Sequence, residues 1–479
     1  MTASMSKTVV TERRNWLALA VLLVGAFMAL LDTTIVNVAI PAIRTRLGAS
    51  NATLSWIVSG YALAFGLALI PAGRVGDRIG HKWVFVAGLS LFTVASLVCG
   101  LAADDMQFIS ARAVQGLAGG MFFTPITALI QLMFGDRKRA RAFAMMGATI
   151  GFSVALGPLV GGLIIAASGG DAGWRLVFDV NVPLGALAVV AAVVLLPAGA
   201  ENTQSGADWP GLVLLSGALV ALLTPLIQGQ QEGWPLWTYA SMAGAIALLV
   251  VFALWERRVE KAGGNPLVPP RLFAHASFTG GVVLALVYFA AFTSIFFTIA
   301  LLWQAGLGHT ALQSGLVVTP FAIGLIGGAS QSDALAARFG RTVLVAGVGM
   351  VAVGITAVWL LLALTPSTGY SGWQLAAPLL LAGVGSGLFI SPNVDFIVAT
   401  VAPEDAGAGS GVVGTAQRVG SAIGIAIIGT VLFGTLRFSA GPDAVALAFG
   451  HSATLATAAS AGLSIAAFVL VFALPKRTG

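Results

Sequence analysis

The sequence predicts an all-α protein that crosses a membrane many times. Of its 479 residues, 58% are hydrophobic and 9% are Asp, Glu, Lys or Arg, whereas a soluble domain carries about 25% charged residues. The apolar residues form long continuous runs, which are typical of membrane-spanning helices and differ from the alternating pattern of a membrane β-barrel. We therefore expect a polytopic helical bundle with short polar connections.

The apolar runs predict fourteen transmembrane helices, since a span needs about 20 apolar residues. The expected spans are 15–38, 54–73, 83–102, 106–133, 142–167, 177–197, 209–227, 237–255, 277–303, 313–332, 342–363, 374–398, 407–434 and 451–474. The seventh and eighth are short and are flanked by Trp209, Trp234 and Trp237, and tryptophan is typical of the membrane–water interface.

The basic residues predict the orientation of these helices. With the N-terminus inside, the cytoplasmic segments hold 18 of the 24 Lys and Arg residues and the opposite side holds four, while Arg112 and Arg418 lie within spans. Such a bias is the positive-inside pattern. We therefore expect a multi-pass protein of the cell inner (plasma) membrane with both termini in the cytoplasm. The basic residues lie in short loops, so the net charge of +6 does not indicate a nucleic-acid partner.

Two polar segments divide the chain. The segment 256–275 contains three prolines, and a second polar break covers 200–208, which are typical of linkers. We expect a six-helix bundle at 1–199, a linker with two extra transmembrane helices at 200–273, and a second six-helix bundle at 274–479. A faint repeat, GRVGDRIGHKW and LAARFGRTV after the second helix of each bundle, is the kind of internal repeat from which many secondary transporters are built.

Five motifs occur along the chain in a consistent order. They are LDTTIVNVAIP at 31–41, GRVGDRIGHK at 73–82, RAVQGLAGG at 112–120, GPLVGG at 157–162 and WRLVFDVNVP at 174–183. With these motifs the chain resembles the major facilitator superfamily, in its fourteen-helix drug:proton antiporter branch, over nearly its whole length. The resemblance implies proton-coupled export of lipophilic, often cationic drugs by alternating access.

Asp32 is a carboxylate within the first apolar span, and an acid there costs roughly 2.5–3.5 kcal/mol on insertion scales, which indicates a function. Counting residues along the helices places Asp32 and Arg112 at a similar depth. Our hypothesis is that Asp32 takes up and releases the coupling proton, and that Arg112 adjusts how readily it does so. The alternative is a static buried ion pair that only fixes helix packing.

The loop motif contains Gly73, Asp77, Arg78 and Gly80. The glycines permit turn geometry and close backbone approach, and Asp77 can accept hydrogen bonds from a helix N-terminus or pair with a base. We expect a gate between the two bundles on the inner face, although Arg78 also fits the positive-inside pattern alone. His81 occupies a position where the superfamily usually has Arg, so one ion pair of its usual network is in doubt.

The fifth helix carries Gly157, Pro158 and Gly161. Glycines at four-residue spacing allow tight helix contact in lipid, and a proline bends or loosens a helix. The resemblance implies an outer seal that flexes during transport, while generic helix packing is the alternative.

Several residues are candidates for the substrate site. The ninth helix carries Phe289, Phe292 and Phe296 on one face, where an aromatic wall would suit flat lipophilic cations, although lipid-facing bulk is equally simple. The remaining candidates are Asn37 and Gln115 in the first-helix and fourth-helix motifs, and the intramembrane charges Asp395 and Arg418.

Other functions are less compatible with the sequence. The chain has no G-x-x-x-x-G-K-[ST] nucleotide motif, so a transporter would need an ion gradient. We find no paired acids with a nucleophile and no metal or cofactor motif, and we therefore expect no enzyme activity, no cofactor and no metal. The expected partners are protons, small substrates and membrane lipids, with the protein acting as a monomer. An exporter of one metabolite, lipid or self-made antibiotic is the main alternative, and a non-transporting sensor or scaffold is a remote one.

Overall fold

The fold was analysed in a computed structural model of the chain. It describes residues 2–474 apart from 50, 169–172, 199–207, 230–231, 399–400, 403–404, 439–440 and 442. Within the helices some side chains also lie outside the described part, among them those of Asn37 and Pro158.

Helices make up almost all of the described residues, which contain no β-strand. The α-helices are α1 (Thr2–Leu47), α2 (Asn51–Ile79), α3 (His81–Leu101), α4 (Asp105–Met133), α5 (Asp136–Ala167), α6 (Gly173–Asp179), α7 (Asn181–Leu195), α8 (Trp209–Gln228), α9 (Leu236–Lys261), α10 (Ala276–Leu301), α11 (Ala311–Phe339), α12 (Thr342–Leu364), α13 (Ala376–Val398), α14 (Ala406–Gly434) and α15 (Ala444–Val471). A π-helical turn, Leu302–Gly306, extends α10.

Thirteen helical segments in the described part of the chain are long and apolar enough to cross a membrane. The all-helical, multi-pass prediction is therefore confirmed. The expected span 142–167 lies within α5, which is 32 residues long but is not one of the thirteen. The count of fourteen spans accordingly stays a prediction. The expected sixth span is divided between α6 and α7, with a turn at Val180.

The chain forms two compact units. Unit 1 comprises Met1–Ser216, Val250–Pro270 and Val401–Gly414, and unit 2 comprises Gly217–Leu249, Arg271–Thr400 and Thr415–Gly479. These units group the chain differently from the division expected from the linkers, which stays a prediction.

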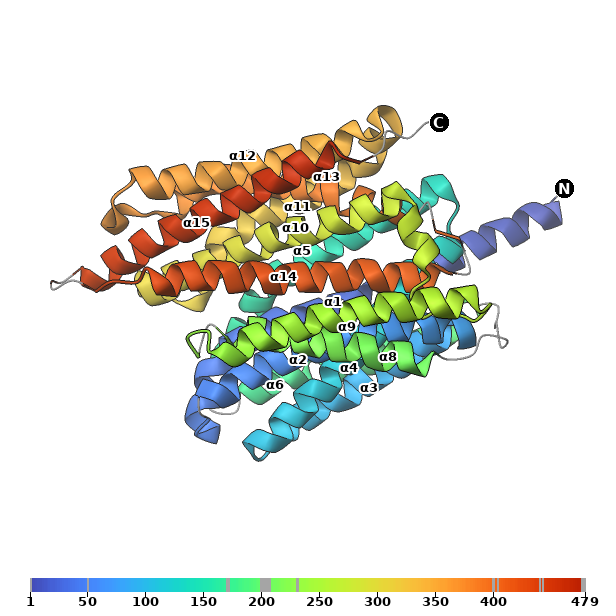
Figure 1. The fold of residues 1–479 in the computed structure, drawn as a ribbon, viewed down its shortest axis with the longest axis horizontal. Coiled ribbons are helices and arrows are strands. Elements are labelled where there is room, and N and C mark those ends of the chain that lie inside the picture. Colours follow the sequence, from blue (N-terminus) through green and yellow to red (C-terminus); the bar gives the residue numbers. More distant parts are fainter. Residues whose placement is uncertain are drawn as a thin grey trace. The chain divides into compact units, whose positions relative to one another are not determined.

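In unit 1, α4 packs against both α2 and α3, and α1 packs along α5 (Figure 1). Small residues allow these close approaches. A Cβ at Gly88 of α3 would lie 2.8 Å from the backbone nitrogen of Phe122 in α4. A core of buried side chains from α1, α3, α4 and α6, including Phe108 and Trp174, fills the space between these helices.

In unit 2, α13 packs between α11 and α12, and α15 contacts both α10 and α12 (Figure 1). Its core is rich in aromatic side chains, with Tyr288 and Phe389 ring centroids 4.3 Å apart.

The two short loops of the faint repeat share a backbone feature. Gly80 alone connects α2 to α3 and has φ 91°, and Gly340 begins the α11–α12 connection and has φ 55°. Positive φ is strained for residues with a Cβ. The glycines of the two motif copies are thus used in the same way, at a sharp turn between consecutive helices.

Candidate functional site

Asp32 and Arg112 form a salt bridge inside unit 1. The carboxylate from α1 is 0% exposed and the guanidinium from α4 is 1% exposed, and Arg112 Nη1 contacts Asp32 Oδ2 directly. The expected pairing of these two residues is therefore present in the structure. Leaving one partner of such a buried pair without the other costs about 3–5 kcal/mol, so the two charges depend on each other.

Gln115 connects the two charges by hydrogen bonds. Its Oε1 accepts a hydrogen bond of 2.6 Å from Arg112 Nη1, and its Nε2 donates one of 3.0 Å to Asp32 Oδ1. Gln115 is completely buried, and it lies one helical turn after Arg112 on α4. In this structure its amide contacts the ion pair, and its predicted role in substrate binding stays a prediction.

Arg112 keeps contacts that do not depend on Asp32. Its Nε donates to the carbonyl oxygen of Ile57 at 3.2 Å. Its guanidinium carbon also lies 4.2 Å from the ring centroid of Tyr61 and 5.6 Å from that of Phe178, within the range of cation–π attraction. If Asp32 became neutral, the cation would still have two oxygen acceptors and two aromatic faces.

Three neutral polar residues around the pair were not predicted. Asn181 of α7 donates to Asp32 Oδ1 at 3.4 Å, Ser96 Oγ of α3 accepts from Gln115 Nε2 at 2.7 Å, and Tyr61 of α2 donates to the carbonyl of Ala29 at 3.0 Å. Asn181 lies in the motif 174–183, which was the only signal for it. Side chains from α1, α2, α3, α4 and α7 thus form one buried polar cluster.

Hydrogen-bond donors surround the Asp32 carboxylate. It accepts from the amides of Gln115 and Asn181 and from the guanidinium of Arg112. Asp32 is fully buried, so water does not reach the carboxylate in this conformation. Among the described residues, no three His, Cys, Asp or Glu side chains lie close enough together to hold a metal ion.

The loop motif fastens the end of α2 to the start of α14. Asp77 Oδ1 accepts a hydrogen bond of 3.0 Å from the backbone nitrogen of Gly407, in the first turn of α14, where the helix dipole favours a negative charge. A Cβ at Gly73 would lie 2.6 Å from the carbonyl carbon of Gly407. We call Gly73, Asp77 and Gly407 the latch.

Polar and charged side chains surround the latch. His81 Nε2 lies 3.2 Å from Asp77 Oδ1, so this position retains a partner for Asp77 even though it is not Arg. Arg74 Nη1 lies 3.7 Å from Asp77 Oδ2 and 3.6 Å from Asp405 Oδ1. Arg78, predicted as part of the gate, is exposed. Its role stays a prediction.

In α5, Gly157 lies against α1 close to the ion pair. A Cβ at position 157 would lie 2.7 Å from Thr34 Cβ and 3.1 Å from the backbone nitrogen of Ile35. Gly161 is also buried, whereas Pro158 falls outside the described side chains. The close approach of α5 to α1 therefore places Gly157 against Thr34, which follows Asp32 by two residues.

Replacing Gly157 with Ala is expected to lower the free energy of unfolding by about 1–3 kcal/mol, because the added methyl overpacks the α1–α5 contact. Gly162→Ala is the matched control, since a Cβ there meets nothing within 4 Å. It should change stability by less than about 0.5 kcal/mol. Thermal unfolding of both variants in detergent measures the difference, and equal behaviour of the two would show that this contact is not tight.

The three predicted aromatic residues of α10 lie together. The ring centroids of Phe289 and Phe292 are 5.5 Å apart, and those of Phe292 and Phe296 are 5.2 Å apart. Phe321 of α11 packs edge-on against both Phe292 and Phe296. They belong to the aromatic core of unit 2, so whether they also line a substrate path stays a prediction.

The other predicted substrate residues come from three helices, α1, α13 and α14. Asp395 of α13 and Arg418 of α14 are half-buried in unit 2. Asn37 falls outside the described side chains. The role of each in substrate binding stays a prediction.

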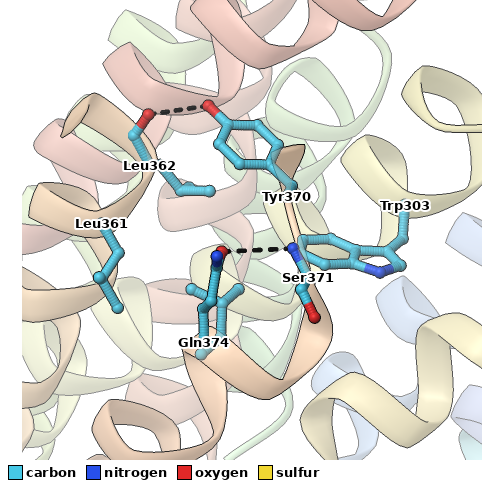
Figure 2. Close-up of a pocket in the computed structure, with 7 residues that line it drawn as sticks. Trp303, Leu361, Leu362, Tyr370, Ser371 and Gln374 are labelled. Atoms are coloured by element: carbon cyan, nitrogen blue, oxygen red, sulfur yellow. Dashed lines mark hydrogen bonds between the residues drawn. The ribbon is translucent and has the colours of Figure 1, made fainter. Parts of the chain in front are cut away.

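A shallow hollow lies in unit 2, between the π-helical turn after α10, the end of α12 and the connection from α12 to α13 (Figure 2). It is lined by Trp303, Leu361, Leu362, Tyr370, Ser371, Gln374 and Leu375. Tyr370 donates to the carbonyl of Leu362 at 2.8 Å across its edge (Figure 2). The side chains leave no room for even a water-sized molecule inside it, whereas a drug-sized ligand needs a pocket of about 300–1,000 Å³, so this hollow is not a transport site.

The described part of the chain is helical, with many candidate membrane spans and an ion pair buried among them, which defines a polytopic membrane protein. Intramembrane charges of this kind are typical of transport proteins. Residues 22–425 match the sequence profile of the Major Facilitator Superfamily. The protein belongs to this superfamily, whose members carry small molecules across membranes and typically act as monomers.

Similar proteins agree with this assignment. The chain is 37% identical over 424 residues to the probable actinorhodin transporter of Streptomyces coelicolor, covering 88% of this chain and 73% of that protein. It is 33% identical over 422 residues to the tetracenomycin C resistance and export protein of Streptomyces glaucescens, covering 88% and 76%. The solved structure of a proton:xylose symporter has the same fold, with a TM-score of 0.68, 14% identity and coverage of 96% and 95%.

Proposed function

We propose that this protein is a proton-coupled antiporter that exports small lipophilic molecules, often cationic drugs, by alternating access. The observation that carries the proposal is the fully buried Asp32–Arg112 pair bridged by Gln115. An ionisable pair of this kind in a membrane-spanning helix is expected to take part in transport, since its insertion is costly.

In the proposed cycle Asp32 carries the proton. When Asp32 is ionised, Arg112 and Gln115 hold it in the cluster. When it binds a proton, the attraction to Arg112 weakens, while Arg112 keeps the Ile57 carbonyl and Gln115 Oε1 as acceptors. Protonated Asp32 therefore loses its ion pair with Arg112, which links α1 to α4, while Arg112 keeps other hydrogen-bond acceptors. Proton binding would thus bias the cluster towards the conformation that opens it.

The alternative is an exporter specific for one antibiotic that the cell itself makes. It is supported by the relatives, which include antibiotic transport, resistance and export proteins. Both alternatives use the same proton site. A substrate screen in cells that lack their own exporters would distinguish them, because a broad exporter protects against many unrelated compounds and a specific one protects against few.

The experiment that tests proton coupling uses purified protein in proteoliposomes with an imposed pH gradient. A gradient of two pH units is worth about 2.7 kcal/mol per proton, equivalent to about 100-fold accumulation for one proton exchanged per neutral substrate. Vesicles that are acidic inside should accumulate substrate, and a proton ionophore should abolish the accumulation. Equal uptake with and without the gradient would contradict the proposal.

A further inference from the structure

Unit 1 also contains two acids that lie close to each other, Asp208 and Glu256. Asp208 precedes α8, and Glu256 lies near the end of α9, where it is 1% exposed. Glu256 Oε2 accepts a hydrogen bond of 2.8 Å from the backbone nitrogen of Val268. Asp208 Oδ1 accepts from the backbone nitrogen of Gly211 at 3.0 Å and from Trp255 Nε1 at 2.9 Å. One oxygen of each carboxyl group is therefore well satisfied.

The other oxygen of each acid is buried without a partner. Neither Asp208 Oδ2 nor Glu256 Oε1 has a hydrogen-bond partner among the described residues. Both atoms lie against Gly211, because a Cβ built there would contact each of them. The two unsatisfied oxygens thus face the same small space. Two ionised carboxylates in this arrangement would repel each other, whereas one proton between them gives each oxygen a hydrogen-bond partner.

The charged groups around this acid pair come from α2 and from the start of α14. Arg74 of α2 is the nearby cation, and it is already shared with Asp77 and Asp405. Arg74 also donates to the carbonyl oxygens of Pro266 and Leu267, the latter at 2.6 Å. The segment 266–268, which we call the strap, is therefore held by Arg74 on one side and by Glu256 on the other.

We propose that Asp208 and Glu256 form a proton-binding site separate from Asp32, and that the proton bound there keeps the strap fastened to α9. Loss of this proton leaves two facing carboxylates beside Gly211, and these repel each other. The repulsion moves the two side chains apart and draws Glu256 Oε2 away from the Val268 nitrogen. This gives the extra helix pair a function, since α8 and α9 each contribute to the site that senses the proton.

The test is hydrogen–deuterium exchange of the purified full chain in lipid nanodiscs, without substrate or gradient. Protection factors of peptides that cover the strap are compared between pH 6 and pH 9, so that the intrinsic pH dependence of exchange cancels. The wild type should lose protection by about tenfold or more across this range. Glu256→Gln is always neutral, can accept from Val268 and can donate to Asp208, so its protection should stay constant within about twofold.

Glu260→Gln is the matched control, because it removes a carboxylate one turn further along α9 and should leave the wild-type profile unchanged. A second measurement is infrared difference spectroscopy between the two pH values. The loss of a carboxylic-acid C=O band is expected in the wild type and not in Glu256→Gln. Asp208→Asn serves in both measurements if Glu256→Gln fails to fold.

Three outcomes would overturn the proposal: constant protection in the wild type, the same pH profile in Glu256→Gln, or protection that follows the Na⁺ concentration instead of pH. None of these outcomes depends on transport. A failure of this site would therefore leave the role of Asp32 untouched, and a failure of proton-coupled export would leave this site untouched.

Discussion

Asp32→Asn is expected to abolish gradient-driven export while leaving the protein folded in the membrane. Asn has almost the same shape as Asp and can still accept a hydrogen bond from Arg112, but it cannot bind and release a proton near neutral pH. In the proteoliposome experiment, the roughly 100-fold accumulation driven by two pH units should fall to simple equilibration, because substrate movement no longer requires a proton to move the other way.

Substrate exchange without a gradient separates this loss of coupling from general damage. The variant should still exchange labelled substrate across the vesicle membrane, since binding and alternation do not consume the gradient. Asp104→Asn is the matched control. It removes a carboxylate from the N-terminus of the helix that carries Arg112, and Asn can keep the N-cap hydrogen bond that Asp104 accepts from the Gln107 nitrogen at 2.8 Å. This control should accumulate substrate like the wild type.

A purely structural ion pair predicts a different result. In that case the main cost of Asp32→Asn is the uncompensated charge on Arg112, about 3–5 kcal/mol of stability, and the double variant Asp32→Asn with Arg112→Gln should recover both stability and export. If Asp32 carries the proton, the double variant recovers stability but not gradient-driven accumulation. Recovery of accumulation in the double variant would refute our assignment of Asp32.

The pairing of Asp32 with Arg112 could be predicted because charges are rare inside membrane spans. Each lies in a long apolar helix, so counting residues from the helix ends gives its depth to within a turn. The costly burial of each charge then requires a partner at the same depth. Composition and the apolar runs likewise predicted the all-helical, multi-pass fold, because backbone groups in lipid must be satisfied within helices.

The neutral members of the cluster could not be predicted in the same way. Ser96 and Tyr61 are residue types that occur often in membrane helices, so nothing in their type indicates a role. Their contacts with Gln115 and the α1 backbone depend on helix rotation, which a broad apolar pattern does not specify. The sequence placed Glu256 in a linker, because the segment 256–275 is polar. In the structure α9 continues to Lys261, and Glu256 is buried.

Gly73 and Asp77 were predicted to form a gate, yet their partner Gly407 could not be identified from the sequence. Gly407 lies more than three hundred residues from Asp77 and has no side chain that could indicate the contact. On the α14 side the contact is made by a backbone N–H, which every residue except proline carries. The only sequence feature consistent with the close approach of α2 to α14 is the small size of Gly73 and Gly407.

Gly73→Ala is therefore expected to open the latch. The added methyl would lie 2.6 Å from the Gly407 carbonyl carbon and 3.3 Å from Thr124 Cγ2. A backbone carbonyl cannot rotate away as a flexible side chain can, so α2 and α14 must separate, and the Asp77 hydrogen bond to Gly407 lengthens. An overpacking cost of about 1–3 kcal/mol corresponds to an approximately 5- to 150-fold shift between latched and unlatched conformations.

Hydrogen exchange at the first turn of α14 measures this shift directly, and export in proteoliposomes measures its consequence. Gly60→Ala is the matched control on the same helix, because a Cβ there has only a Trp56 ring carbon, at 3.8 Å, nearby. Asp77→Asn separates charge from shape, since it keeps an oxygen acceptor for Gly407 but removes the charge that favours the helix N-terminus. We expect faster exchange and impaired export in Gly73→Ala, a smaller effect in Asp77→Asn, and no effect in Gly60→Ala. Wild-type exchange at α14 in Gly73→Ala would show that the added methyl is accommodated without opening the latch, and it would contradict the tight contact between α2 and α14.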